Sequence, residues 1–132
     1  FVAGTFCHHP LAMATSLKTL EILNLSNGKL LHQLNSMTEN FCTRMNIFFI
    51  ENGLKISIVN FGSLFRFIVP GRHKQIYSQL LVNGVYIWEG RNCFLSPAHN
   101  EDIIASLEEK IKLSCMQLIE NGIIKTKNQK KI

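Results

Sequence analysis

The sequence has few charged residues and no long apolar run. Of its 132 residues, 17% are charged and 46% are hydrophobic, which excludes an intrinsically disordered or low-complexity chain. No apolar run reaches the ~18 residues that a membrane-spanning helix needs, so we expect no membrane partner. The two common glycine-rich phosphate loops, the Walker type and G-x-G-x-x-G, are also missing.

Cysteine is present but never as a C-x-x-C pair. The four cysteines are Cys7, Cys42, Cys93 and Cys115. In a chain this rich in core residues we expect them to be reduced, which favours a cytoplasmic protein. His8 and His9 lie beside Cys7, but neighbouring residues seldom direct their side chains at one ion. We therefore predict no metal site.

Positive charge is concentrated at the C-terminal end. Four of the 14 Lys and Arg residues lie in the last eight positions, which leaves 10 basic residues against 9 acidic ones elsewhere. We expect residues 125–132 to form a basic flexible tail, and we expect no nucleic-acid partner because the body carries no basic excess. The alternative, a tail that docks or binds anions, stays open. The four lysines are Lys125, Lys127, Lys130 and Lys131.

Four Asn-Gly pairs divide the chain, and each follows a stretch with helical periodicity. Gly or Asn just after a helix caps its last carbonyls, so we interpret the pairs as helix ends. The pattern predicts helices over residues 10–25 and 29–51, with Leu17, Leu20 and Leu23 facing inward in the first. The apolar stripe of the second is Leu30, Leu34, Met37, Phe41, Met45 and Phe48.

The rest of the sequence predicts short strands and two more helices. A helix over 73–82 and a last helix capped by Asn100 are expected, with Ile103, Leu107, Ile111 and Leu118 facing inward. The sum is an α+β fold, with a small three- to four-stranded, mainly antiparallel sheet packed against helices. The expected strands are 54–58, 64–69, 85–88 and 93–96.

Two segments are candidate binding sites. Gly4 and Thr5 precede a helix that starts at Pro10, where a hydroxyl and free N–H groups can hold a phosphate. Trp88, Glu89 and Arg91 form a loop between two short strands, where a guanidinium can bind a carboxylate. On pattern alone, an ordinary turn and a solvated loop are the favoured explanations of these residues.

The same two segments resemble class III aminotransferases, which depend on pyridoxal phosphate. Residues 4–14 are similar to the family stretch GT-x-x-x-x-P-L-A-x-A. Residues 84–99, which read GVYIWEGRNCFLSPAH, resemble the C-terminal domain of the glutamate-1-semialdehyde aminomutase-like branch. The likeness is greatest to aminotransferase modules of nonribosomal peptide and polyketide synthases.

This resemblance implies a domain organisation and site roles. Residues 1–10 would be the end of a large cofactor domain with its phosphate-contacting turn, and residues 11–124 the small C-terminal domain of a fold type I enzyme. Gly4 and Thr5 would bind the phosphate of pyridoxal 5'-phosphate, commonly that of the other subunit of a homodimer. Trp88, Glu89 and Arg91 would line the substrate entrance.

The family's Schiff-base lysine lies before the GT motif, and only residues 1–3 precede that motif here. The resemblance thus implies no catalytic residue in this chain, which alone would be inactive. The parent would transfer an amino group from an amino acid to a keto acceptor, possibly one held on an acyl carrier protein. A 1,2-amino shift and a non-catalytic interaction or dimerisation module are the alternatives.

Overall fold

The computed structural model describes residues 3–126. The described residues form four α-helices, one short 3-10 helix and three β-strands. They fall into two compact units, Phe1–Gln33 and Leu34–Ile132, which are considered separately below. Of the expected basic tail at 125–132, only Lys125 and Thr126 lie within the described residues.

The first unit contains helix α1 (Pro10–Leu25), with the bounds that the sequence predicts. Pro10 occupies the first helical position, where its missing N–H is not needed. At the other end, Asn27 and Gly28 take positive φ angles of 47° and 77°, which ends the helix.

The prediction that Leu17, Leu20 and Leu23 of α1 face a core is wrong. No residue of α1 is buried, and Leu17 and Leu20 are 60% and 64% exposed. The apolar residues of this helix are distributed around its whole circumference and form no single stripe that one packing surface could cover.

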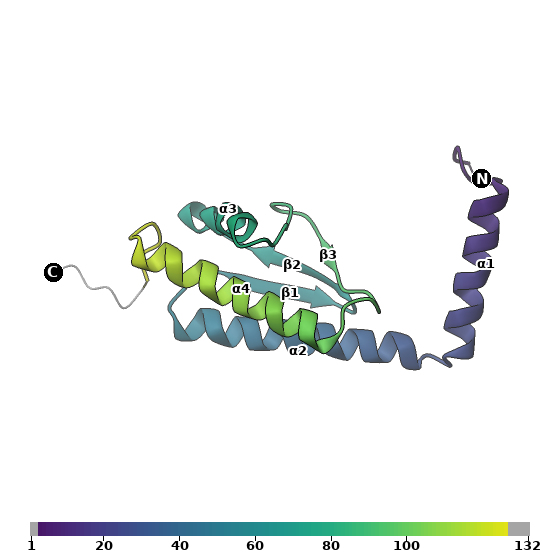
Figure 1. The fold of residues 1–132 in the computed structure, drawn as a ribbon, viewed down its shortest axis with the longest axis horizontal. Helices are drawn as coiled ribbons and strands as arrows, with labels where there is room; N and C mark the ends of the chain where they lie inside the picture. Colours follow the sequence, from purple (N-terminus) through teal and green to yellow (C-terminus); the bar gives the residue numbers. More distant parts are fainter. Residues whose placement is uncertain (1–2, 127–132) are drawn as a thin grey trace. The chain divides into compact units, whose positions relative to one another are not determined.

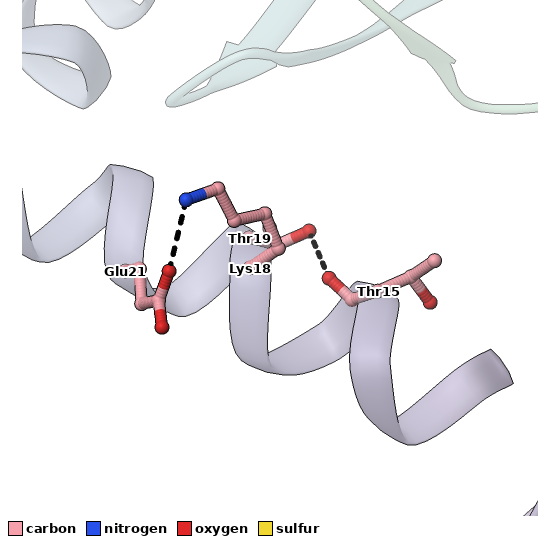
Figure 2. A network of polar contacts seen from close by, with 4 residues as sticks. All are labelled: Thr15, Lys18, Thr19 and Glu21. Atoms are coloured by element: carbon pink, nitrogen blue, oxygen red, sulfur yellow. Dashed lines mark hydrogen bonds and ion pairs between the residues drawn. The ribbon is translucent and has the colours of Figure 1, made fainter. Parts of the chain in front are cut away.

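The polar side chains of α1 bond within the helix itself (Figure 2). The hydroxyl of Thr19 donates to the carbonyl of Thr15 at 2.9 Å, and that of Thr15 donates to the carbonyl of Leu11, also at 2.9 Å. Lys18 and Glu21 form an exposed ion pair at 3.0 Å. These groups satisfy one another locally, and α1 therefore directs no free threonine hydroxyl toward a ligand.

The second unit is built on an antiparallel sheet with the strand order β1-β2-β3 (Figure 1). Its strands are β1 (Ser57–Phe61), β2 (Leu64–Ile68) and β3 (Cys93–Phe94). Ile58 lies opposite Phe67 on the first pair, and Phe65 lies opposite Cys93 on the second. The predicted α+β class with a three-stranded sheet is confirmed.

Only one face of this sheet is covered. Ile58, Phe65 and Phe67 point into the core and are buried. The residues that alternate with them point the other way and stay exposed: Val59, Phe61, Arg66, Ile68 and Phe94. The second unit therefore has two layers, helices on one side of the sheet and an apolar open face on the other.

Helices α2 (Lys29–Glu51) and α4 (Glu101–Glu120) supply nearly half of the core residues found in the described part of the chain. Phe41 of α2 is fully buried, and its ring meets that of Phe65 edge to face at 5.4 Å between centroids. The short helix α3 (Gln75–Val82) adds Ile76 and Leu80, as its periodicity predicts. A 3-10 turn, η1 (Gly71–Lys74), precedes α3.

On α4, Ile111 and Leu118 are buried as predicted, but Ile104 is buried in place of Ile103. Ile103 is 46% exposed, whereas Ile104 is 1% exposed and belongs to the core. The buried stripe continues through Glu108, a position whose charge argues for the surface. Its carboxylate is held there by Arg44 of α2, whose Nη2 lies 2.6 Å from Oε1 and whose Nε lies 2.8 Å from the same oxygen. This ion pair joins α2 to α4.

Two strand predictions need correction. Residues 85–88 keep the predicted alternation, with Val85 and Ile87 half-buried, but they pair with no strand of the described sheet. The N–H of Val85 instead donates to the carbonyl of Leu80 at 2.8 Å, closing the end of α3. The first predicted strand, 54–58, begins three residues later, at Ser57.

Asn46 takes the place of a missing neighbour strand at the edge of β1. Its amide nitrogen donates to the Ile58 carbonyl at 2.8 Å, and its oxygen accepts the Ile58 N–H at 2.7 Å. Replacing Asn46 by alanine removes both bonds, and we expect it to lower the free energy of unfolding by about 2 kcal/mol. Urea unfolding of the variant measures this loss. Asn40→Ala, at an exposed site of the same helix, is the control and should change little.

Candidate functional site

Gly4 and Thr5 begin a tight turn that leads into α1. The N–H of Cys7 donates to the Gly4 carbonyl at 3.1 Å, and the N–H of His9 donates to the Phe6 carbonyl at 3.1 Å. A Cβ atom at Gly4 would lie 3.1 Å from the Cys7 sulfur, so a larger residue there would crowd the turn. The turn thus fixes Thr5 just before the helix.

The Thr5 side chain is exposed, and its hydroxyl has no hydrogen-bond partner among residues 3–126. A hydroxyl donor on a short, constrained turn is chemically suited to a phosphate oxygen. The residues present therefore fit one side of a phosphate site. Their role in binding a phosphate stays a prediction.

The second predicted site is a turn that joins residues 85–87 to β3. The guanidinium carbon of Arg91 lies 5.1 Å from the centroid of the Trp88 ring, a cation–π contact. The N–H of Arg91 donates to the Trp88 carbonyl at 3.2 Å, and Gly90 supplies the positive φ of 65° that the turn requires. Trp88 and Arg91 are thus brought together, and both side chains are exposed.

Glu89 points to a different partner. Its carboxylate lies 2.8 Å from the ammonium of Lys74, at the end of η1. This hydrogen bond raises the pKa of Lys74 above its usual value. Because both side chains are about half exposed, the pair contributes little to stability, and its effect is to orient the loop.

Arg66 of β2 is a further cation at this loop that the sequence analysis missed. Its Nη2 lies 3.9 Å from the position that a Cβ of Gly90 would occupy. The loop therefore carries the guanidinium of Arg91 and lies next to that of Arg66. Strand alternation places Arg66 on the outer face, but only the fold shows that the loop passes this face.

A groove of about 550 Å³ lies at the base of the loop. The segments on both sides of the loop line it, through Val85, Ile87 and Leu95. The start of α4 closes it with Ile103 and Leu107, which explains why Ile103 remains partly exposed. The lining is mainly apolar, with a few polar groups at its edge, as in many small-molecule sites.

The cysteines offer no reactive group to this region. Burial raises the pKa of the Cys42 thiol to about 11 and that of Cys115 to about 12, so both stay protonated at neutral pH. Cys93, beside the groove, also has its pKa raised by burial. In the described part of the chain no three His, Cys, Asp or Glu side chains gather as a metal site would require. Nor does any helix there have the length and apolar content to cross a bilayer.

Comparisons with known proteins agree with the resemblance. No protein-family model matches the chain. A glutamate-1-semialdehyde 2,1-aminomutase from Syntrophomonas wolfei is 30% identical over 118 residues, covering 76% of this chain. A solved structure described as a transaminase with PLP bound matches 94% of this chain with a TM-score of 0.79 and 22% identity.

The first match confirms the resemblance to an aminomutase, and the second confirms the fold that this resemblance implies. The TM-score shows that this chain shares its fold with part of the transaminase. At 22% identity, this structural likeness shows the fold alone. The chain spans 27% of the aminomutase and 31% of the transaminase, so it corresponds to a part of each. The relation to synthase modules stays a prediction.

Proposed function

We propose that this chain is the C-terminal part of a pyridoxal-phosphate-dependent aminotransferase. The observation that carries the proposal is the 30% identity over 118 residues to a glutamate-1-semialdehyde 2,1-aminomutase. The match of 94% of the chain to part of a transaminase with PLP bound supports the fold that the proposal requires. In this proposal residues 11–124 are the small domain, and the cofactor lies mainly in a larger domain.

Gly4 and Thr5 bind the phosphate of the cofactor in this account. Thr5 donates its hydroxyl to a phosphate oxygen, and Gly4 keeps the turn open for a close approach. When bound, pyridoxal phosphate withdraws electrons from the carbon whose amino group is transferred. The lysine that holds the cofactor lies outside residues 1–132, so this chain alone is inactive.

Trp88, Glu89 and Arg91 form one side of the substrate entrance. Arg91 binds a carboxylate of the amino donor, Trp88 contacts its guanidinium, and the Glu89 pair with Lys74 holds the loop in place.

Replacing Arg91 by glutamine is expected to raise the KM for a dicarboxylic donor about tenfold, because one charge-assisted contact is lost. Steady-state kinetics of the complete enzyme with glutamate and with alanine measure this. If Arg91 binds the second carboxylate, alanine is unaffected and serves as the matched control. Equal losses with both donors would contradict the assignment.

The acceptor of the amino group is a keto compound, and we propose a β-keto acyl chain on an acyl carrier protein as its finer identity. The apolar groove beside the loop supports an acceptor with an aliphatic part. Comparing a free keto acid with the same acyl group bound to a carrier protein tests this point. Higher kcat/KM with the free acid would argue against a carrier.

A 1,2-amino shift is the second candidate reaction. It is favoured by the curated relative, whose name gives it as a glutamate-1-semialdehyde aminomutase. The shift needs no separate acceptor, since one molecule supplies and receives the nitrogen. Conversion of glutamate-1-semialdehyde without an added keto acid would select this reaction over transamination.

The open face of the sheet is the surface that we assign to the large cofactor domain. It carries Phe61 and Phe94, which are 86% and 60% exposed, together with Val59 and Ile68. A contiguous apolar face of this kind is costly in water and marks an interaction surface. We also propose that the complete enzyme is a homodimer, in which Thr5 contacts the cofactor of the other subunit.

Replacing Phe61 and Phe94 by serine is expected to lower the melting temperature of the complete enzyme but not that of the 132-residue chain. In the 132-residue chain, both side chains are exposed and the melting temperature should hardly change. In the complete enzyme each buried phenylalanine contributes about 2 kcal/mol, so the melting temperature should fall. Val82→Ser, at an exposed site of α3, is the control. No fall in the complete enzyme would contradict docking at this face.

The experiment that tests the function is an amino-transfer assay on the protein encoded by the whole reading frame that contains this chain. We expect cofactor-dependent formation of a keto acid from an amino donor. We expect none from residues 1–132 alone. A complete protein that neither transfers nor shifts an amino group would leave the interaction-module alternative.

A further inference from the structure

A second cavity, of about 460 Å³, shares no lining residue with the groove described above. Three segments that are distant in sequence line it: Lys55 before β1, the turn Pro70–His73, and residues 123–125 after α4. Neither the proposed cofactor contact nor the proposed substrate entrance uses any of these residues.

Lys55, Arg72 and Lys125 all line this cavity, and none of its lining residues is acidic. The ion pairs found within residues 3–126 are Lys18–Glu21, Arg44–Glu108 and Lys74–Glu89, and none of them includes these three cations. Three like charges around one cavity repel one another, and an anion between them relieves that repulsion. The body of the protein is nearly neutral, so this local excess is not a general property of its surface.

His73 fixes one wall of the cavity. Its ring is buried, and its Nε2 accepts the backbone N–H of Lys55 at 3.4 Å. This contact ties the Pro70–His73 turn to the segment before β1 and so holds Lys55 and Arg72 on the same cavity. Burial, and next the charge of Lys55, lower the pKa of His73, so the ring is neutral at pH 7 and suited to this acceptor role.

We propose that this cavity binds a small phosphorylated or polyphosphate anion. Arg72 supplies a planar fork that matches two phosphate oxygens, and Lys55 and Lys125, which line the same cavity, supply point charges. The volume accommodates more than one phosphate group but no extended strand of a macromolecule. In this proposal Lys125, the first lysine of the basic C-terminal segment, helps to bind the anion. The proposal does not depend on the proposed aminotransferase function, because it uses none of the same residues.

Calorimetric titration of the 132-residue chain with inorganic pyrophosphate tests the proposal. We expect saturable binding at a single site. Arg72→Gln should weaken it about tenfold, because one charge-assisted contact is lost, and Arg72→Lys should weaken it less. Lys29→Gln, which removes an exposed lysine of α2, is the matched control and should leave the affinity unchanged. Arg72 is exposed, so its variants should keep the melting temperature of the wild type.

A variant with Lys127, Lys130 and Lys131 replaced by glutamine distinguishes anion binding at the cavity from anion binding by these later lysines. Retained pyrophosphate binding in this variant supports the cavity. Loss of binding there, with Arg72→Gln unchanged, would overturn the proposal. Tighter binding of a single-stranded oligonucleotide than of pyrophosphate would overturn it as well, in favour of a nucleic-acid surface. No binding of pyrophosphate at millimolar concentration would also refute it.

Discussion

Replacing Thr5 by alanine is expected to weaken pyridoxal-phosphate binding by the complete enzyme about tenfold to hundredfold. The proposed contact is a hydrogen bond to a dianionic phosphate, and loss of one such charge-assisted bond costs about 1.5–3 kcal/mol. The hydroxyl of Thr5 has no other partner within residues 3–126, so its removal should not disturb the turn itself. Cofactor titration followed by absorbance measures the dissociation constant.

Thr5→Ser is the matched control, because it keeps the hydroxyl and removes only a methyl group. Its affinity for the cofactor should stay close to that of the wild type. Thr15→Ala, on α1, provides a second control, since that hydroxyl is already bonded to the helix backbone. An alanine at position 5 that binds the cofactor normally would show that the phosphate lies elsewhere.

Replacing Phe41 by alanine is expected to cost about 4 kcal/mol of unfolding free energy in the 132-residue chain. The ring is fully buried between α2 and the sheet and packs edge to face against Phe65. Its loss removes buried apolar surface and leaves a cavity that the rigid sheet cannot fill. This is a large share of the stability of a domain of this size. Urea unfolding monitored by circular dichroism gives the value.

Phe61→Ala is the control for this prediction, because the residue type is the same and the side chain is 86% exposed. It should change the unfolding free energy by less than about 0.5 kcal/mol. Similar losses at the two positions would contradict the burial pattern of β1 and the assignment of the open face.

Helix ends were the best-predicted part of the fold. Each Asn-Gly pair follows a helix, and Gly28, Gly53, Gly84 and Gly122 all have positive φ angles. The prediction succeeded because the left-handed conformation is a local property of one or two residues. The bounds of α1 and α2, and the Asn100 cap that accepts the Ile103 N–H at 2.9 Å, follow from equally local rules.

Tertiary pairing decided the features that the sequence did not predict. Residues 85–88 alternate as a strand does, yet their alternation comes from lying over the core after α3, and no neighbouring strand is available to them. In α4, Ile111 and Leu118 are buried as predicted, but Ile104 is buried in place of Ile103. Glu108 is also buried, because its carboxylate is compensated by Arg44, 64 residues away in sequence. The local sequence pattern shows neither the absence of a neighbouring strand nor the pairing of Glu108 with Arg44.

In the candidate sites, too, local features could be predicted from the sequence, whereas contacts between distant segments could not. The loop with Trp88 and Arg91 was predictable from its residues, and the cation–π contact gives those two side chains a common orientation. Arg66, which lies near Gly90 of the loop, comes from another strand and only the fold reveals it. The roles of Gly4, Thr5, Trp88, Glu89 and Arg91 in binding remain predictions for the experiments above to decide.

Cofactor trapping in the complete enzyme tests the central claim most directly. The protein encoded by the whole reading frame is saturated with pyridoxal phosphate, reduced with borohydride and digested, and the modified lysine is identified by mass spectrometry. Because the cofactor is proposed to be held by a lysine of the larger domain, we expect one stoichiometric modification, at a lysine outside residues 1–132. A stoichiometric modification of a lysine within these residues, or no stoichiometric modification at all, would contradict the account.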